Sequence, residues 1–223
     1  AVVLVRQRGQ EIYRRAAGYL DREAGTPMVE DAVFRLASVS KPIVSTAALA
    51  LVGQGRLGLD DLVARWLPYF APRLPDGTVA AMTVRHLLTH TAGLDYGFFQ
   101  PPGGAYAQAG VSDGMDASRT SLEDNLRRLA TVPLAYAPGE RWAYSIATDV
   151  LGGVIEAVTG LPLAHAVAQL VTAPLAMRDT GFISTEPARL AVAYADRAAG
   201  EARPQRLLDE GEDHLPFLDG MAG

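Results

Sequence analysis

The sequence predicts an α/β (α+β) protein, in which an antiparallel sheet is flanked by helices and joined to a mostly helical region. Three observations support this class. The first residues have the pattern of a β-hairpin, residues 43–52 are almost entirely apolar like a buried helix, and helical signals dominate from there to about residue 171. We expect an incomplete sheet region over residues 1–68 and 178–223, and a helical region over residues 69–177.

The N-terminal elements follow from local signals. Two β-prone runs flank residues 8–10, which predicts a hairpin with its turn at Gly9. Residues 32–38 form a further short strand-like piece that leads into the helix. Because nearly every residue of 43–52 is apolar, this helix should be buried almost all round, and Gly53 should end it.

Capping residues predict the helices that come next. Asp60 is placed to cap a short helix, and Thr83 is placed to cap a second one. Thr120 and Glu123 form a capping box before a third helix. The stretch 95–119 is rich in Gly, Pro and Asp and has no period, so we expect a long functional loop there.

Two more helices are expected in the second half. Residues 145–158 carry an apolar stripe at every fourth position, and Gly160 closes that helix. Residues 163–171 form the next one. The tail beyond residue 186 is mixed and ends in an acidic, loop-like segment.

These elements leave a deficit of strands. A hairpin and one short strand cannot cover a buried helix, and an isolated hairpin is marginally stable in water. Its open edge would also invite aggregation. We therefore expect that C-terminal strands are missing from this chain, and that a second polypeptide or residues outside the given sequence supply them.

Composition and charge limit the function classes. The chain has 223 residues and a net charge of −5, which argues against a nucleic-acid partner. No apolar run is long enough to span a membrane and no leader is seen, so we expect a cytoplasmic protein without a membrane partner. The absence of cysteine excludes disulfides, thiol nucleophiles and cysteine-bound metals.

One serine matches a known nucleophile motif. The segment GVSDG, residues 110–114, fits the G-x-S-x-G elbow with Ser112 at its centre. An elbow needs an apolar strand before the serine and a helix just after it. Neither GGAYAQA before it nor MDASRT after it fits this context. We therefore expect Ser112 to be a solvent-facing loop serine and not the nucleophile.

The single lysine is a stronger signal. Of 20 basic residues only Lys41 is lysine, and Ser38 lies three residues before it in ASVSKPIV. On a helix, residues i and i+3 share a face, so the amine can reach the hydroxyl. Burial disfavours an ammonium and makes lysine a usable base. Ser40 lacks this spacing, and a surface cation would oppose the helix dipole at this position.

A second proton-transfer group is expected near the serine and lysine. Tyr144 just precedes the helix over 145–158, so its hydroxyl can project into a cleft. Beside a lysine cation its pKa would fall and it could move protons. From spacing alone this assignment stays open, because a tyrosine at a helix boundary is more often a packing residue.

The histidines do not predict a metal site. His86 and His90 are four residues apart, but no neighbouring Glu or third ligand completes a metal motif. We expect hydrogen-bonding roles for both residues. No metal and no organic cofactor is expected.

Five segments together resemble the serine β-lactamase-like and penicillin-binding-protein superfamily, and within it the family VIII carboxylesterases. They are FRLASVSKPIV, LDDLVARWLP, TVRHLLTHTAGL, YSIATDVLGGVIEAVTG and PLAMRDTGF. The resemblance covers about residues 2–182. It implies a β-lactamase/transpeptidase-like fold, with Ser38 as the acylated nucleophile, Lys41 as its activating base and Tyr144 as the general acid/base partner.

The resemblance also implies two substrate-binding residues, and the sequence departs from the family at two points. Tyr96 would form a wall of the acyl or alcohol pocket, and Asp149 would give polar support near the tyrosine. Tyr-Ser-Ile at residues 144–146 replaces the Tyr-Ser-Asn of class C β-lactamases, which favours a simple esterase. The third superfamily motif, Lys-Thr-Gly or a Trp-Gly-Gly-like turn, is missing.

We therefore expect hydrolysis of short-chain, small-molecule carboxylic esters through an acyl-enzyme, at a site between the sheet region and the helical region. A β-lactamase or D-amino-acid peptidase that uses the same residues is the first alternative. An inactive β-lactamase-like binding protein is the second.

Overall fold

The computed structural model describes residues 1–114, 120–184, 186–195 and 205–206. The chain divides into two compact units. The first contains Ala1–Leu36 and the segment that begins at Ile183, and the second contains Ala37–Phe182. Residues 37–68, which the sequence analysis grouped with the sheet region, therefore pack with the helical unit.

The first unit begins with the predicted hairpin, which is confirmed. Strand β1 (Val2–Gln7) pairs antiparallel with β2 (Gln10–Ala16). The two residues between them, Arg8 and Gly9, have φ angles of 50° and 82°. Two consecutive left-handed residues give the type of tight turn whose twist matches that of paired strands.

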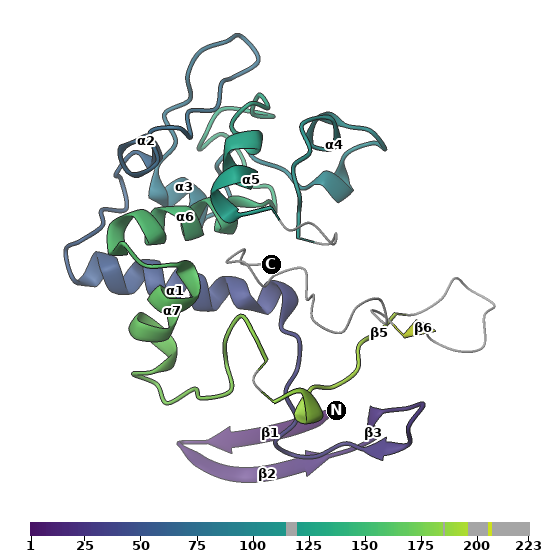
Figure 1. Ribbon diagram of the computed structural model, residues 1–223. Coiled ribbons are helices and arrows are strands. Elements are labelled where there is room, and N and C mark those ends of the chain that lie inside the picture. The colour runs from purple at the N-terminus through teal and green to yellow at the C-terminus, as the bar shows by residue number, and fades with distance from the viewer. Residues whose placement is uncertain (115–119, 185, 196–204, 207–223) are drawn as a thin grey trace. The chain divides into compact units, whose positions relative to one another are not determined.

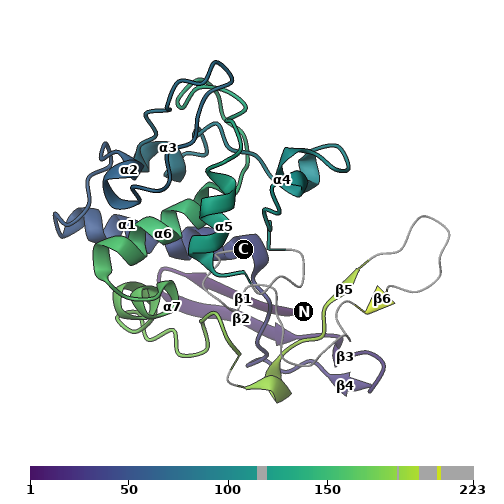
Figure 2. The same cartoon turned by 45° about the horizontal axis from the view of Figure 1, so that its top comes forward.

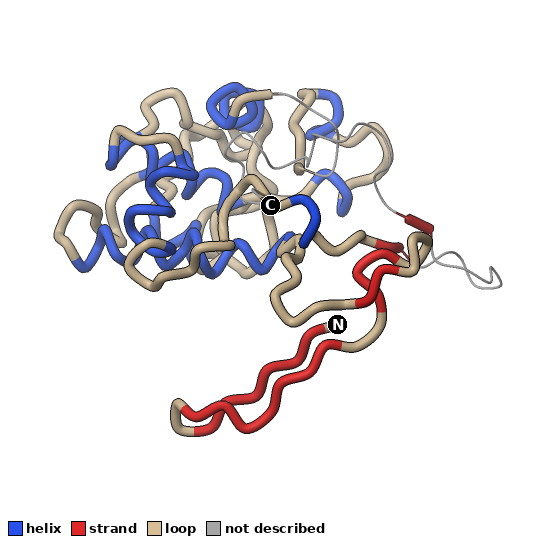
Figure 3. Tube along the Cα trace, turned by 60° about the horizontal axis from the view of Figure 1, so that its bottom comes forward, coloured by secondary structure: helices blue, strands red, loops and turns tan. Residues whose placement is uncertain are grey.

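Further short strands complete the described part of this unit (Figure 3). β3 (Tyr19–Asp21) pairs with β4 (Thr26–Pro27), and β5 (Tyr194–Ala195) pairs with β6 (Gln205–Arg206), both antiparallel. A 3-10 turn covers Pro187–Arg189.

The strand predicted over 32–38 is wrong. Val33 makes only an isolated parallel bridge with Leu190. The extended run then stops, because Ala37 has a left-handed φ of 45° and begins the 3-10 turn Ala37–Val39.

The first unit buries little apolar surface. Among its described residues only Leu20 and Ala191 are buried and apolar. Along the hairpin, five large apolar or aromatic residues have between 41% and 58% of their surface exposed: Val3, Leu4, Val5, Ile12 and Tyr13. The hairpin is therefore held mainly by its own backbone hydrogen bonds.

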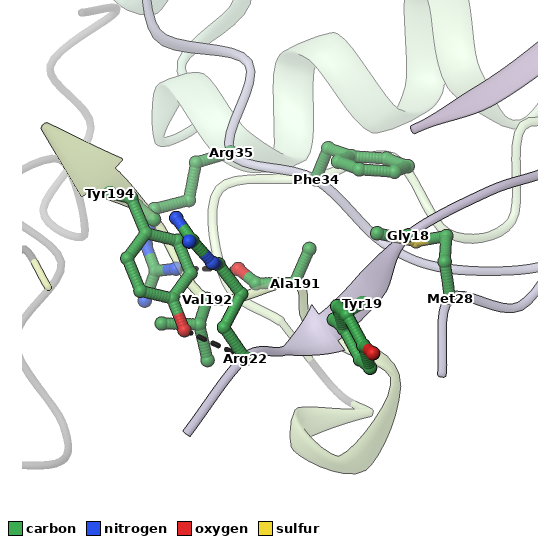
Figure 4. A pocket seen from close by; sticks show the side chains of 10 residues that line it. Gly18, Tyr19, Arg22, Met28, Phe34, Arg35, Ala191, Val192 and Tyr194 are labelled. Carbon is green, nitrogen blue, oxygen red and sulfur yellow. Dashed lines mark hydrogen bonds between the residues drawn. The ribbon is translucent and has the colours of Figure 1, made fainter. Parts of the chain in front are cut away.

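A hollow of about 420 Å³ opens in this unit, lined by residues of 18–35 and 191–194 (Figure 4). Arg22 lies over the Tyr194 ring at 5.5 Å, and its backbone N–H donates to the Tyr194 hydroxyl at 2.9 Å. Arg35 donates to the carbonyl of Ala191 at 3.1 Å. None of the residues that the sequence analysis assigned to catalysis lines this hollow.

The second unit is helical. Its α-helices are α1 (Ser40–Gly53), α2 (Val63–Trp66), α3 (Val84–Leu88), α4 (Ala105–Gln108), α5 (Leu122–Leu129), α6 (Ala147–Thr159) and α7 (Leu163–Val167). A π-helical turn, Ala168–Thr172, continues α7, and a 3-10 turn covers Gly97–Phe99.

Helices α1 and α6 form the centre of this unit and lie side by side (Figures 1 and 2). Helix α6 also contacts α2, α3, α5 and α7. Its predicted apolar stripe packs as expected, with Val150 and Val154 fully buried. Gly153 permits the close approach of α5, because a Cβ there would lie 2.7 Å from Leu126. Gly160, with φ of 71°, ends the helix as predicted.

Helix α1 is buried on one stripe and not all round as predicted. Its buried apolar residues are Val44, Ala47, Ala48 and Leu51. Between them Leu49 points away from the core and is 51% exposed. Only the stripe at i, i+3, i+4 and i+7 can meet α6, so apolar composition alone overstated the burial of this helix.

The predicted caps had mixed outcomes. Thr83 caps α3 as expected, and its Oγ1 accepts the N–H of His86. Asp60 does not cap α2. It forms a bidentate ion pair with Arg85 at 2.8 and 2.9 Å, and α2 begins later, at Val63.

The capping box predicted from Thr120 and Glu123 is wrong by one residue. The cap of α5 is Ser121, whose Oγ accepts the N–H of Asp124 at 3.1 Å. Both pairs have the same spacing, so the sequence could not decide between them.

The predicted long loop over 95–119 contains helix α4 and one 3-10 turn in its described part. The buried side chain of Asn125 fixes its far end. It accepts the N–H of Ser112 and donates to the carbonyl of the same residue, both at 2.8 Å. Residues 115–119, and the acidic tail predicted at the C-terminus, lie outside the described residues.

Among the described residues, no single helix is both long and apolar enough to cross a membrane. In the same described part, α6 together with Leu163–Thr172 reaches that length and composition, and these two segments meet at a bend of 78°.

Candidate active site

Ser38 lies in the 3-10 turn that immediately precedes α1. The residue before it, Ala37, has a φ of 45°, which is strained for a residue other than glycine. Ser38 itself is exposed to solvent. The turn therefore presents the serine hydroxyl at the start of a buried helix.

Lys41 lies in the first turn of α1 and is only 6% exposed. Its Nζ donates a hydrogen bond to Ser38 Oγ at 3.2 Å. The i, i+3 spacing seen in the sequence therefore places amine and hydroxyl in contact, as expected for one helical face.

Tyr144 brings a third polar group to the same oxygen. Its hydroxyl donates to Ser38 Oγ at 2.5 Å, and Lys41 Nζ lies 5.0 Å from the centre of its ring. Tyr144 precedes α6, which is anchored in the core through Ile146 and the residues that follow. The starts of the two central helices thus hold the three side chains together.

Two opposing effects set the pKa of Tyr144. Burial raises the pKa of the phenol, but the hydrogen bonds with Ser38 and Lys41 and the positive charge of Lys41 outweigh burial. The net result is a pKa below the ordinary value of 10.0. A phenol that releases its proton more readily is suited to proton transfer at the serine.

Tyr96 lies beside this group and is only 4% exposed. Its ring centre is 5.4 Å from that of Tyr144 and 5.5 Å from Lys41 Nζ. Phe98 stacks on the Tyr96 ring at 4.6 Å. Burial, with help from nearby acidic groups, raises the pKa of Tyr96 well above its usual range, so this phenol stays neutral.

Asp149 lies in the first turn of α6 and is 2% exposed. Its Oδ1 is buried and has no hydrogen-bond partner within the described part of the chain. Burial raises the pKa of this carboxyl to about 8, although the charge of Lys41 lowers it, and Asp113 adds to the rise. A carboxyl so deeply buried supports the site from within the core and has almost no surface to offer a substrate.

Ser112 lies elsewhere in the same unit, and its predicted solvent exposure is wrong. It is 3% exposed, and its Oγ accepts the N–H of Gly114 at 3.1 Å. The amide of Asn125, which pairs with the Ser112 backbone, holds the serine inside. Ser112 stands in a turn without an entering strand, as the sequence context predicted.

The predicted hydrogen-bonding roles of the two histidines are confirmed. His86 Nδ1 accepts the N–H of Thr83 at 3.2 Å, and His90 Nδ1 accepts the N–H of Ser145 at 3.3 Å. Within the described residues no group of three or more His, Cys, Asp or Glu side chains is arranged to hold a metal ion. No sequence pattern indicated that His90 would lie beside Tyr144, because the two are far apart along the chain.

Comparisons with known proteins identify the relatives of this chain. The family described as Beta-lactamase matches residues 1–221. Esterase EstB of Burkholderia gladioli is 54% identical over 222 residues, which are 100% of this chain and 56% of that protein. Acyltransferase mokF of Monascus pilosus is 31% identical over 193 residues, or 81% of this chain and 45% of that protein.

A solved structure shows the same fold. EstCE1, described as "a hydrolase with promiscuous acyltransferase activity", matches with a TM-score of 0.89 and 48% identity. The match covers 93% of this chain and 54% of that one. The β-lactamase/transpeptidase-like fold that the resemblance implied is therefore confirmed.

The chain spans about half the length of the curated relatives it matches. None of these comparisons supports the second polypeptide that the sequence analysis considered as a source of missing strands. The family match extends over nearly the whole sequence. The chain belongs to the beta-lactamase family.

Proposed function

We propose that the protein is a serine carboxylesterase that hydrolyses small carboxylic esters through an acyl-enzyme at Ser38. The observation that carries this proposal is the double hydrogen bond at Ser38 Oγ, from Lys41 Nζ at 3.2 Å and from the Tyr144 hydroxyl at 2.5 Å. The similarity to esterase EstB and to the hydrolase EstCE1 supports it.

The pair of Lys41 and Tyr144 acts after it has released one proton to solvent, so that either the amine or the phenol is unprotonated. In the first half-reaction Ser38 Oγ attacks the ester carbonyl and its proton passes to that unprotonated group. The depressed pKa of Tyr144 favours its role in this transfer. The same pair then protonates the departing alcohol, which leaves an acyl group on Ser38. In the second half-reaction water attacks this acyl group and the pair takes its proton. The pair then returns the proton to Ser38 Oγ as the acid is released.

Charge develops on the carbonyl oxygen during both attacks. We assign part of its stabilisation to backbone N–H groups at the start of the 14-residue helix α1, where the helix dipole favours negative charge. Asp149, buried near Lys41, would keep the lysine in place by electrostatic attraction whenever the carboxyl is ionised.

The walls of the site suggest an apolar ester. Phe98 stacks on the buried ring of Tyr96, which lies beside Lys41. Phe98 and Phe99 are 53% and 61% exposed, so they offer apolar surface near the site. Ile146 is fully buried and offers no amide to a β-lactam side chain. These features favour simple esters over β-lactams, and hence an esterase over the β-lactamase or peptidase alternative.

The test compares substrates and serine variants of the complete protein. We expect hydrolysis of p-nitrophenyl acetate and butyrate, and at most a trace of nitrocefin hydrolysis. Ser38→Ala should abolish the esterase activity, whereas the matched variant Ser112→Ala should keep it. Faster turnover of nitrocefin than of the esters would favour the β-lactamase alternative, and full activity in Ser38→Ala would refute the proposal. An inactive wild-type protein would favour the binding-protein alternative.

A further inference from the structure

We infer that His90 is a positioning residue for Tyr144, and that its imidazole with Nδ1 unprotonated holds the phenol in reach of Ser38. This inference rests on the proposed function, in which Tyr144 moves protons at the serine. The role is indirect: His90 contacts Tyr144 and its two neighbours in sequence, and it acts on Ser38 through Tyr144.

The contacts of His90 bracket Tyr144 on both sides. The carbonyl of His90 accepts the N–H of Ala143 at 2.9 Å, and its Nδ1 accepts the N–H of Ser145 at 3.3 Å. Between these two bonds, the imidazole ring lies 5.2 Å from the Tyr144 ring at an interplanar angle of 34°. Trp142 meets the imidazole edge-on at 6.5 Å. One residue thus fixes the backbone before and after the tyrosine and one side of its ring.

The backbone at His90 is shaped for this task. After the end of α3 the chain takes a φ of 53° at His90, a left-handed conformation that is uncommon outside glycine, asparagine, aspartate and histidine. Strain of this kind persists where surrounding contacts determine the conformation, and it gathers at functional sites. Here the left-handed residue is the one whose carbonyl and ring both reach the Tyr144 segment.

The hydrogen bond defines the protonation state of the ring. Because Nδ1 accepts from the Ser145 N–H, the neutral imidazole carries its proton on Nε2. The Ser145 hydroxyl, 3.4 Å from Nδ1, can donate to the same lone pair. A proton on Nδ1 would set two N–H groups against each other and release this side of the segment.

The surroundings keep the ring neutral. Burial, and then the positive charge of Lys41 on α1, lower the pKa of His90 below its usual value of 6.5. The aromatic groups against the ring are the phenol of Tyr144 and the neutral indole of Trp142, and the Ser145 hydroxyl lies at Nδ1. Protonation of His90 therefore needs a more acidic solution than protonation of an ordinary histidine. We expect the catalytic rate to decrease when the pH drops into that more acidic range.

The test uses variants of the complete protein and p-nitrophenyl butyrate as substrate. In His90→Asn the side-chain oxygen can replace Nδ1 as the acceptor, asparagine tolerates the left-handed φ, and the side chain does not titrate. We expect kcat within about threefold of wild type, and an acid limb of the pH profile without the histidine step. In His90→Ala the acceptor is lost, and we expect kcat to fall about 10- to 100-fold with KM nearly unchanged.

His86→Ala is the matched control, because His86 also accepts a backbone N–H through Nδ1, but from Thr83 in the cap of α3 instead of from the Tyr144 segment. Its kcat and pH profile should match wild type. Ser38→Ala, measured alongside, separates this role from the esterase proposal. If Ser38→Ala is inactive while His90→Ala keeps wild-type kcat, or His90→Asn loses as much as His90→Ala, the role of His90 is refuted and the esterase proposal stands. If Ser38→Ala is active, both fail.

A measurement on the wild-type protein covers the case in which the alanine variant does not fold. The ¹⁵N signals of the His90 ring report its tautomer directly. We expect the neutral form protonated on Nε2, persisting as the pH falls below 6.5, the usual pKa of histidine. A proton on Nδ1 at neutral pH would overturn the inference whatever the variants do.

Discussion

At the scale of single residues, the site depends on one amine that the rest of the chain does not duplicate. All other basic residues are arginine, whose guanidinium does not release a proton in proteins. Lys41 is buried, and its Nζ touches the hydroxyl of Ser38. A lysine can serve there as a proton carrier, whereas an arginine would supply only charge and a larger side chain.

The buried carboxyl of Asp149 should make the folding stability depend on pH. Burial raises its folded-state pKa to about 8 from 3.8, so between these values the folded protein binds more protons than the unfolded chain. Folding stability should therefore fall as pH rises through this window, by up to about 1.4 kcal/mol for each step of one in pH.

Asp149→Asn, which stays neutral, removes this loss. The melting temperature of the wild type should therefore drop relative to the variant between about pH 5 and pH 8. If the melting temperatures of the two proteins change with pH in parallel across that range, the raised pKa of Asp149 is contradicted.

Residues close in sequence were predictable from spacing, and residues joined across the fold were not, apart from Tyr144, which the family resemblance indicated. Ser38 and Lys41 are one helical turn apart, so their contact could be read from spacing. The bond from Ser145 to His90 spans 55 positions, and no local pattern marks it. The burial of Ser112 likewise depends on Asn125, which lies 13 residues further on.

At the scale of elements, the hairpin and α6 were predictable because their signals are local. A turn sequence specifies the hairpin, and a regular apolar stripe specifies the helix. The errors came where a partner outside the element decides. Asp60 pairs with Arg85, 25 residues away, and so does not cap α2. The run 32–38 has the composition of a strand, but the described residues give it only one bridge.

At the scale of elements, we predict that a side chain at Gly93 would destabilise the fold. Gly93 has a φ of 80°, and a Cβ there would lie 2.2 Å from the carbonyl oxygen of Tyr136, whose segment leads to Tyr144. Gly93→Ala should therefore cost about 3 kcal/mol or more of unfolding free energy, because the clash with backbone adds to the left-handed strain.

Gly55→Ala is the control for Gly93→Ala. Gly55 has a φ of 70°, but no atom lies within 4 Å of the place that a Cβ would take, so its substitution carries only the strain of the left-handed conformation. We expect a cost of about 1 kcal/mol in urea titrations. Equal losses for the two variants would show that the close approach at Gly93 is not what matters.

At the scale of the whole molecule, apolar burial is concentrated in the helical unit. The buried residues of the main core all lie between Val44 and Val171. Among the residues that the structure describes, the hairpin exposes apolar side chains and contributes none to this core. The overall fold class was predictable from the elements and from the family resemblance, but this uneven distribution of burial was not, since it depends on which elements pack together.

Hydrogen exchange of the 223-residue chain tests this distribution. Amides of α1 and α6 should exchange slowest, because opening them requires loss of the core. Amides of β1 and β2 should exchange faster, by about 100-fold or more, since their bonds open without disturbing buried contacts. Equal protection of the hairpin and α6 would contradict this expectation.

The central claim, that buried Lys41 makes Ser38 the reactive alcohol, is tested most directly by labelling with a fluorophosphonate and locating the adduct by mass spectrometry. We predict one adduct per protein on the peptide that contains Ser38, and a labelling rate at least about 100-fold lower in Lys41→Arg with the fold intact. An adduct on Ser112 or another residue, or unchanged labelling of Lys41→Arg, would contradict the claim.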